Sequence, residues 1–274
     1  MSLMLKVGPE SGHQKVVERG KNGIRWLGLD IVRLAAGETW KTKLADEEAG
    51  LVVMSGKCTI RVGKETFEGV GGRADMFAGP TSLVYAPRQS EVEVKAEGKL
   101  ELAFAHVPCE KDLPVKLVTP DQVKLVSAGM ANWRRDLRLY LPPGSAIGQR
   151  MIIGETINPP GNWSGIPPHK HDEHSAIENV LEEFYLFKLK PANGDGVQLM
   201  MQNGQPMAHV VRNDDVSVLL DGYHPTGALP GTTVGYLWLL SGDSKVYDIT
   251  TDPRYAWVAA TEAVLKEMKA SRQH

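Results

Sequence analysis

The sequence is poor in cysteine and has no long apolar run. Its 274 residues include two cysteines, Cys58 and Cys109, and these do not form a Cys-x-x-Cys motif. This argues against a disulfide-rich scaffold or a cysteine-ligated zinc site, and we expect two buried thiols. Nowhere do about 18 apolar residues follow one another, as a membrane-spanning helix requires, and the N-terminal segment has no apolar core of signal-peptide length. Together these absences predict a cytoplasmic protein without a membrane partner.

The sequence also lacks an excess of charge of one sign. Its 31 Lys and Arg residues are balanced by 33 Asp and Glu residues, which gives a net charge of −2. Proteins that bind nucleic acid present clustered positive charge to the phosphate backbone, and this chain has no basic block. We therefore expect no nucleic-acid partner. The composition is compatible with a homo-oligomer.

Turn-forming residues, by contrast, are frequent. The chain holds 28 Gly and 17 Pro, and its apolar residues come in short runs between them. Polar and apolar residues alternate in Cys58–Val62, Glu91–Ala96 and Glu182–Pro191, which is typical of half-buried antiparallel strands. The order of strands and turns in residues 50–107 recurs in residues 183–240. The sequence thus predicts an all-β protein with two similar β-barrels or jelly rolls.

Changes of texture along the chain indicate the domain boundaries. Residues 1–115 are predicted to form the N-terminal domain and residues 148–274 the C-terminal one. Residues 116–147 mix polar, Pro and Gly residues with scattered apolar ones, and we interpret them as the connection. Near the end the period-two pattern is lost, and Asp252 as N-cap with Pro253 at the first helical position predicts a C-terminal helix.

Candidate metal ligands are concentrated in the second half. His169 and His171 are two residues apart, so on an extended strand both side chains leave the same face. Glu183 shares a strand face with aromatic and apolar residues, whereas Glu182 lies on the other face, so Glu183 is expected to point into the barrel. A lone carboxylate there needs a metal, a proton or a positive charge. His224 follows an apolar strand and a Gly turn and completes the group.

Three imidazoles and one carboxylate suit a first-row divalent metal such as Zn, Mn, Fe, Co or Ni, with open positions for substrate. These residues do not select one metal. His174 is an alternative ligand, although its loop favours a solvated or outer position. No histidine occurs between His13 and His106, so the first barrel is expected to bind no metal. The insertion between His171 and Glu183 is expected to form a loop at the rim of the pocket.

This order of ligands on a strand-rich chain resembles the cupin superfamily, and the repeated halves resemble a bicupin. Blocks between Trp133 and Val258 narrow the likeness to the 5-deoxy-glucuronate isomerase family of bacterial inositol catabolism, which is related to the 4-deoxy-5-hexulose-uronate ketol-isomerases. The blocks read GETINPPGNWSGIPPHKHD, LEEFYLFKLKP, DDVSVLLDGYHP, GYLWLLSG and TDPRYAWV. The resemblance implies two cupin domains with a C-terminal helix and a metal held by His169, His171, Glu183 and His224. The chain departs from the family pattern at Gly165, Leu199, Leu220 and Asp221.

The resemblance also implies a function. It indicates a metal-dependent aldose–ketose isomerase, an intramolecular oxidoreductase whose small-molecule substrate is a deoxy-uronic acid. The expected reaction converts 5-deoxy-glucuronate to 2-deoxy-5-keto-gluconate in myo-inositol catabolism. Two other hypotheses stay open: a cupin dioxygenase, because the same ligands hold Fe(II), and a non-catalytic bicupin that binds a sugar acid. Oxygen consumption would indicate the first, and ligand-induced stabilisation without turnover the second.

The chemistry calls for a group that moves a proton between C2 and C1 of the sugar, first as base and then as acid. The sequence leaves three candidates open for this group, namely Tyr185, Glu155 and Glu178.

A uronic acid also carries a carboxylate, which requires a cation for its recognition. Arg150 and Lys188 are the residues we expect to bind it. Gln198 and Tyr236 lie on strands expected to line the same barrel and are predicted to contact the substrate.

Overall fold

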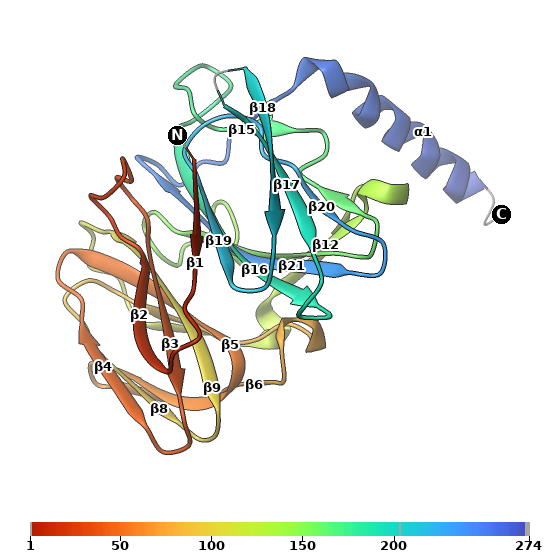
Figure 1. Ribbon diagram of the computed structural model, residues 1–274. Coiled ribbons are helices and arrows are strands. Elements are labelled where there is room, and N and C mark those ends of the chain that lie inside the picture. Colours follow the sequence, from red (N-terminus) through yellow and green to blue (C-terminus); the bar gives the residue numbers. More distant parts are fainter. Residues whose placement is uncertain (1, 203, 272–274) are drawn as a thin grey trace.

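The computed structural model describes residues 2–202 and 204–271, and it is built almost entirely from β-strands (Figure 1). Two sheet-based domains lie against each other, and helix α1 (Ala256–Ser271) extends from the second one. The all-β class, the two barrel-like domains and the C-terminal helix predicted from the sequence are confirmed.

The N-terminal domain is a branched nine-stranded sheet that folds back on itself. Strand β5 is 16 residues long and joins its two halves, because it pairs with β7 and β9 near its start and with β6 and β8 near its end. The alternating segments Cys58–Val62 and Glu91–Ala96 are paired partners in β5 and β8. The strands of this domain are β2 (Gly12–Val17), β3 (Gly28–Leu34), β4 (Thr39–Lys43), β5 (Glu47–Val62), β6 (Glu65–Arg73), β7 (Leu83–Ala86), β8 (Glu91–Ala96), β9 (Leu100–Pro108) and β10 (Lys116–Val118).

The C-terminal domain combines a seven-stranded sheet with a four-stranded one. The larger sheet runs in the order β1 (Leu3–Lys6), β19 (Asp215–Leu219), β16 (Leu181–Lys190), β21 (Thr233–Gly242), β13 (Ile152–Asn158), β12 (Arg135–Leu141) and β11 (Lys124–Ala128). The smaller sheet runs β14 (Trp163–Ser164), β20 (Thr226–Ala228), β17 (Gly196–Gln202) and β18 (Gln205–Val211). A two-residue pair, β15 (His169–Lys170) with β22 (Thr250–Thr251), lies beside them.

Two segments lie elsewhere than the sequence analysis expects. Strand β1 belongs by position to residues 1–115, yet it pairs with β19 and so completes the C-terminal sheet. Residues 116–147 are more than a connection, because they supply β10 to the first domain and β11 and β12 to the second. The alternation of Leu137 and Leu139 with charged residues is a strand signal that the neighbouring Pro and Gly residues obscured.

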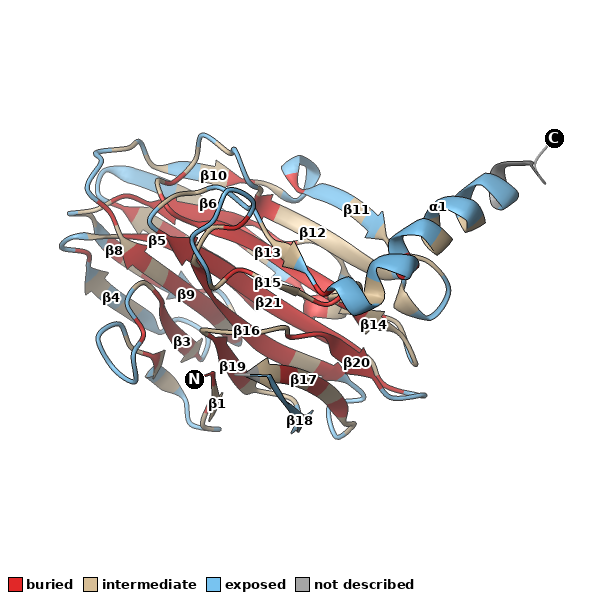
Figure 2. Ribbon diagram, turned by 90° about the horizontal axis from the view of Figure 1, so that it is seen from above, coloured by how far each residue is buried: buried red, intermediate tan, exposed pale blue. Residues whose placement is uncertain are grey.

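Three hydrophobic clusters stabilise the two domains. One fills the N-terminal barrel around Leu51 and Phe104, and a second joins the domains through Tyr85 and Phe184. The third lies inside the C-terminal barrel, contains Phe187, and unites side chains of the seven- and four-stranded sheets. Figure 2 shows this burial along the central strands. Because each large buried side chain contributes about 1.5–3 kcal/mol, the interface cluster packs the domains into one unit.

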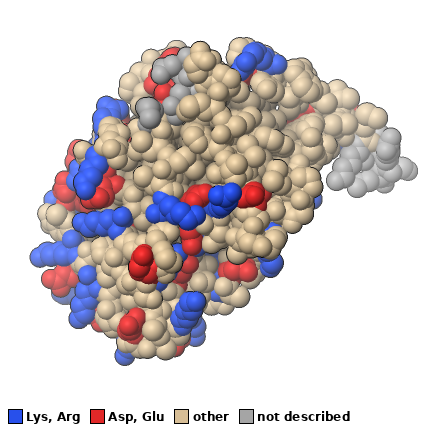
Figure 3. Space-filling view, viewed as in Figure 1, with Lys and Arg blue, Asp and Glu red and all other residues tan. Residues whose placement is uncertain are grey.

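The surface carries both signs of charge. Figure 3 shows basic and acidic side chains interspersed over the N-terminal domain on the face in view. At the end of the chain the Asp252 carboxylate accepts the backbone N–H of Arg254 and caps the short 3-10 turn Pro253–Tyr255, which leads into α1. Among residues 2–202 and 204–271, no helix has both the length and the apolar character needed to cross a membrane.

Candidate metal centre

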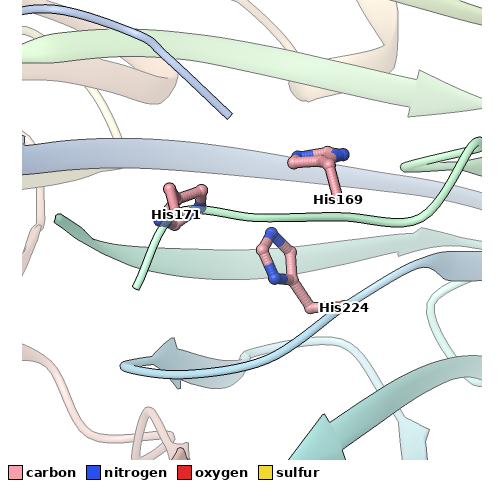
Figure 4. Close-up of side chains that lie close together, drawn as sticks. All are labelled: His169, His171 and His224. Atoms are coloured by element: carbon pink, nitrogen blue, oxygen red, sulfur yellow. The ribbon is translucent and has the colours of Figure 1, made fainter. Parts of the chain in front are cut away.

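Three histidines converge at one end of the C-terminal barrel. His169 and His171 come from the segment that contains β15, and His224 comes from the loop between β19 and β20. One ring nitrogen of each lies within 4.8 Å of the others, and Figure 4 shows the three side chains gathered from these two segments. The ring centroid of His224 lies 5.0 Å from that of His169 and 5.0 Å from that of His171. This group could hold a metal ion.

Backbone carbonyls orient two of the imidazoles. His171 Nδ1 lies 2.7 Å from the carbonyl oxygen of Leu181, and His224 Nδ1 lies 2.9 Å from that of Gly222. With Nδ1–H donated to these oxygens, the Nε2 atom of each ring carries the lone pair that a metal needs. Both Nε2 atoms lie 3.3 Å from Oε2 of Glu183.

Nε2 of His224 is a buried polar atom whose hydrogen-bonding capacity is not used within the described part of the chain. His224 is 2% exposed, and its Nε2 has no hydrogen-bond partner within the described part of the chain. Buried polar atoms in proteins are normally satisfied, so an unpartnered nitrogen aimed at two other histidines and a carboxylate fits a metal ligand. The donor set of imidazole nitrogens and one carboxylate suits the first-row divalent metals.

The electrostatics favour the protonation states that metal ligands require at His169 and Glu183, whereas at His171 burial would lower the pKa but the hydrogen bond and charge of Glu183 raise it. Burial, followed by the charges of His224 and His171, lowers the pKa of His169 to about 3. Burial alone would raise the pKa of Glu183, but its interactions with His171 and His224 outweigh burial and lower it to about 2. His169 is therefore neutral and Glu183 ionised at neutral pH, as metal coordination requires.

Strand parity places Glu183 at this site. In β16 the side chain of Glu183 faces the barrel interior, together with Tyr185, and both line the cavity described below. Glu182 faces the other domain, where its carboxylate accepts the backbone N–H groups of Arg25 and Trp26 at 2.8 Å each. The alternation of side chains along a strand separates two adjacent glutamates by function.

A cavity of about 290 Å³ opens beside the candidate ligands, close to the ~300 Å³ at which small-molecule pockets begin. His169 and Glu183 form part of its wall, and its polar lining includes Thr156, Ser164 and Arg135. The other walls are largely aromatic and are formed by Tyr185, Tyr236, Trp238 and Tyr247. The Tyr236 hydroxyl lies 2.7 Å from Ser164 Oγ, and the Tyr247 hydroxyl lies 3.4 Å from His169 Nε2. An apolar cavity with a few polar groups beside a histidine cluster can hold a small polar ligand.

The three acid–base candidates lie in different places. Tyr185 lines the cavity. Glu155 lies on the opposite face of β13, at the domain interface, where Arg73 and Arg138 donate to its carboxylate at 2.5 Å and 3.0 Å. Glu178 is 2% exposed and accepts backbone N–H groups of the loop that follows His171, so it does not face the cavity either.

The expected substrate contacts are also divided. Tyr236 lines the cavity, whereas Gln198 is fully buried outside the lining, and its amide atoms have no hydrogen-bond partner among the described residues. The Arg150 guanidinium donates to the carbonyl oxygens of residues 242 and 243. Lys188 is paired with Glu101 and Asp214, at 2.5 Å from each. Both cations therefore lie outside the cavity and hold structure together.

His174, the alternative ligand, lies outside the histidine cluster. Its side chain is 63% exposed and lies 3.7 Å from the carboxylate of Asp243. It therefore occupies the solvated loop position that the sequence analysis favours.

Several residues of the site were not predicted from the sequence. Arg135, Trp238 and Tyr247 line the cavity but were not among the sequence-based candidates. The signal for Arg135 was its period-two spacing with Leu137 and Leu139, which line the cavity from the same strand. Tyr247 comes from an irregular loop, whose orientation no local pattern indicates.

The chain matches known proteins over most of its length. The profile of the KduI/IolB family matches residues 4–258. The 5-deoxy-glucuronate isomerase of Geobacillus thermodenitrificans is 32% identical over 262 residues, which cover 94% of this chain and 95% of the relative. The enzyme of the same name from Bacillus subtilis strain 168 is 28% identical over 246 residues, which cover 88% of this chain and 91% of that one.

Solved structures agree on the fold. An IolB-like protein from Salmonella typhimurium LT2 superposes with a TM-score of 0.90 at 28% identity and covers 94% of this chain and 99% of its own. A single-residue variant of Bacillus subtilis oxalate decarboxylase superposes with a TM-score of 0.65 at 12% identity, over 92% of this chain and 79% of its own. The second likeness concerns the fold alone, and both agree with the predicted bicupin architecture.

Proposed function

The chain belongs to the KduI/IolB family, and from this premise we propose that it is a metal-dependent aldose–ketose isomerase that converts 5-deoxy-glucuronate to 2-deoxy-5-keto-gluconate. The observation that carries the proposal is the convergence of three imidazoles and Glu183 beside a cavity of about 290 Å³, whose wall includes His169 and Glu183. We infer the substrate from the relatives, which are 5-deoxy-glucuronate isomerases. Because this sugar acid is an intermediate of inositol catabolism, we place the enzyme in the cytoplasm.

The four side chains that would hold the metal are His169, His171, Glu183 and His224. A divalent ion bound there would act as a Lewis acid on the carbonyl and neighbouring hydroxyl oxygens of the sugar. Nitrogen-rich donor sets of this kind suit Zn, Mn, Fe, Co or Ni, and elemental analysis distinguishes these metals.

The remaining chemistry belongs to the cavity walls. Of the acid–base candidates, Tyr185 lines the cavity, so we propose that its hydroxyl acts as the acid, which donates a proton to the carbonyl oxygen of the aldose and regains one from the neighbouring hydroxyl. Burial, followed by the negative charge of Glu183, raises the pKa of Tyr185 well above its usual value, so its hydroxyl stays protonated and is ready to donate. The Tyr185 and Tyr236 rings stack with centroids 4.2 Å apart, which fixes the orientation of both rings on the cavity wall.

The proposal is tested with protein purified without chelator. We expect a divalent metal by elemental analysis and interconversion of 5-deoxy-glucuronate and its ketose by NMR, lost on chelation and restored by one of the candidate metals. The variant His224→Ala should lose the metal and reduce turnover at least about 100-fold. His174→Ala, which removes an exposed histidine of the neighbouring loop, is the matched control and should retain both.

Failure of the metal-loaded wild type to isomerise the sugar would refute the proposal, as would full activity of His224→Ala. The same assay checks the other two hypotheses, since a dioxygenase would consume oxygen and a binding protein would be stabilised by the sugar without turnover.

A further inference from the structure

The cavity wall contains one cationic side chain among the residues that the structure describes, and this is Arg135. It opens strand β12 and lies on the same face as Leu137 and Leu139, which also line the cavity. The remaining charged groups of the wall belong to the candidate metal centre. A negatively charged ligand in this cavity has Arg135 as its nearest available counter-charge within the lining.

The guanidinium of Arg135 has spare donor capacity. Its Nη1 donates to the carbonyl oxygens of Trp133 and Ile166, in both cases over a long distance of 3.4 Å. Within residues 2–202 and 204–271, no Asp or Glu oxygen lies within the 4.0 Å of an ion pair with Arg135. An arginine has five N–H donors in a planar fork that matches a carboxylate, and most of them are unused here.

The neighbouring arginines differ from Arg135 in that a carboxylate pairs with the guanidinium of each. Arg134 pairs with Asp136 at 3.2 Å on the exposed side of the strand, and Arg138 pairs with Glu155 at 3.0 Å in the domain interface. The two cations expected from the sequence, Arg150 and Lys188, are likewise engaged with protein groups outside the cavity. Arg135 alone in this set combines a place on the cavity wall with a guanidinium that has no ion-pair partner among the described residues, since Glu262, on which its charge acts, is paired with Lys266 at 2.6 Å.

Arg135 also acts on the metal end of the cavity. Burial is the largest cause of the low pKa of His169, and the positive charge of Arg135 is a further contributor. Burial likewise is the largest cause of the raised pKa of Tyr236, against which the charge of Arg135 acts. The charge thus reaches the histidine cluster and the aromatic wall.

We propose that Arg135 binds the carboxylate of the substrate and makes the site selective for aldoses that end in a carboxylate, over neutral aldoses of the same skeleton. This inference rests on the proposed isomerase function. The carboxylate at Arg135 directs the aldehyde end of the chain toward His169 and Glu183. A bidentate arginine–carboxylate contact fixes both position and direction of a flexible sugar acid.

The test compares Arg135→Gln, Arg135→Lys and the matched control Arg134→Gln, which removes the adjacent, outward-facing arginine. With 5-deoxy-glucuronate, Arg135→Gln should raise KM about 10- to 100-fold, the loss expected for hydrogen bonds to a charged group, and change kcat less. Arg135→Lys keeps the charge without the fork and should lie between this variant and the wild type. Arg134→Gln should match the wild type.

A neutral substrate separates charge recognition from a general loss of structure. With 5-deoxy-glucose, in which a hydroxymethyl group replaces the carboxylate, the wild type should work poorly and Arg135→Gln should be no worse. Metal content and the midpoint of urea unfolding should be unchanged in all three variants. An unchanged KM and an unchanged preference for the acid in Arg135→Gln would overturn the proposal and leave the isomerase function standing.

A binding experiment tests the role of Arg135 even if the proposed isomerase function is wrong. If the wild type does not isomerise the sugar, the proposed function is wrong, and titration calorimetry of the metal-loaded proteins with D-gluconate and with D-glucitol decides the role of Arg135. A preference for D-gluconate that disappears in Arg135→Gln supports carboxylate binding. A preference that persists, or is absent from the wild type, overturns it.

Discussion

Asp172 is expected to control the metal affinity of the centre without touching the metal. Its Oδ1 accepts a hydrogen bond from the Lys170 ammonium at 2.6 Å, and its Oδ2 accepts one from the backbone N–H of Gly222, also at 2.6 Å. The carbonyl of Gly222 is in turn the partner of Nδ1 of His224. Asp172 therefore ties the segment of His169 and His171 to the loop that orients His224.

The size of the effect follows from these contacts. Replacing Asp172 by Asn leaves one acceptor oxygen for two donors, and because Lys170 keeps Glu178 Oε1 at 3.1 Å, the donor that can lose its partner is the N–H of Gly222. Leaving such a partly buried donor unpaired costs about 1–3 kcal/mol in the free energy of unfolding. Loss of the groups that orient metal-bound imidazoles lowers metal affinity about 10- to 100-fold, and we expect a reduction of this size for Asp172→Asn.

The backbone conformation of Gly222 makes its hydrogen bond to Asp172 difficult to replace. Its φ of 78° lies in the left-handed region, which disfavours side chains, so the loop has little freedom to find another geometry once the N–H loses its acceptor.

The assay is competition for the metal between the protein and a chelator of known affinity, with urea unfolding measured in parallel. Glu173→Gln is the matched control, because it also removes a negative charge beside Lys170, at 3.3 Å, but its side chain is 73% exposed. The control should keep wild-type metal affinity. Equal metal affinities for wild type and Asp172→Asn, or equal losses in both variants, would refute the reasoning.

Two further predictions concern the domains around the site. Although burial alone would lower it, hydrogen bonds and charge interactions with Asp30 and Glu47 raise the pKa of His106 to about 9. Because the folded pKa exceeds the unfolded value of about 6.5, a stabilisation of roughly 3 kcal/mol is fully present below pH ~6.5 and is lost as the pH rises through ~9. Urea unfolding between pH 6 and 9.5 should show this loss in the wild type, and an equally steep loss in His106→Gln would contradict it. Glu155→Gln should cost about 3–5 kcal/mol in the free energy of unfolding, because it leaves the buried guanidinium of Arg73 without its counter-charge. Its metal affinity in the same competition assay should not change, and a lost metal would show that Glu155 belongs to the site.

Many of the strands and candidate ligands could be predicted from the local alternation of residues. Alternation identified β5, β8 and β16 as strands, and the same parity assigned Glu183 to the barrel interior and Glu182 to the opposite face, which the structure places at the domain interface. The candidate ligands were found because spacing and strand direction are local properties, and the order of His-x-His, Glu and a late His is visible in one dimension.

Residues whose direction depends on distant partners were beyond such reasoning. Glu155 resembles a cavity residue in sequence, but the pairing of β13 with β12 and β21 turns its side chain toward Arg73 in the other domain. Arg150 and Lys188 were expected to meet the carboxylate because they flank the motifs, yet they pair with Glu110 and Glu101 of the other domain.

The amino-acid sequence by itself determined the all-β class, the family and the group of three histidines and Glu183, since each depends on neighbours within a strand or turn. Only the tertiary structure decided that part of residues 116–147 forms cavity wall, that β1 completes the C-terminal sheet, and that Arg135 is the cation which faces the cavity. The physical reason is that alternation shows which residues share a face of a strand, but not which distant partners that face will meet. Burial and ion pairing with residues far away in the chain then decide which cations are consumed by the fold and which one stays available to a ligand.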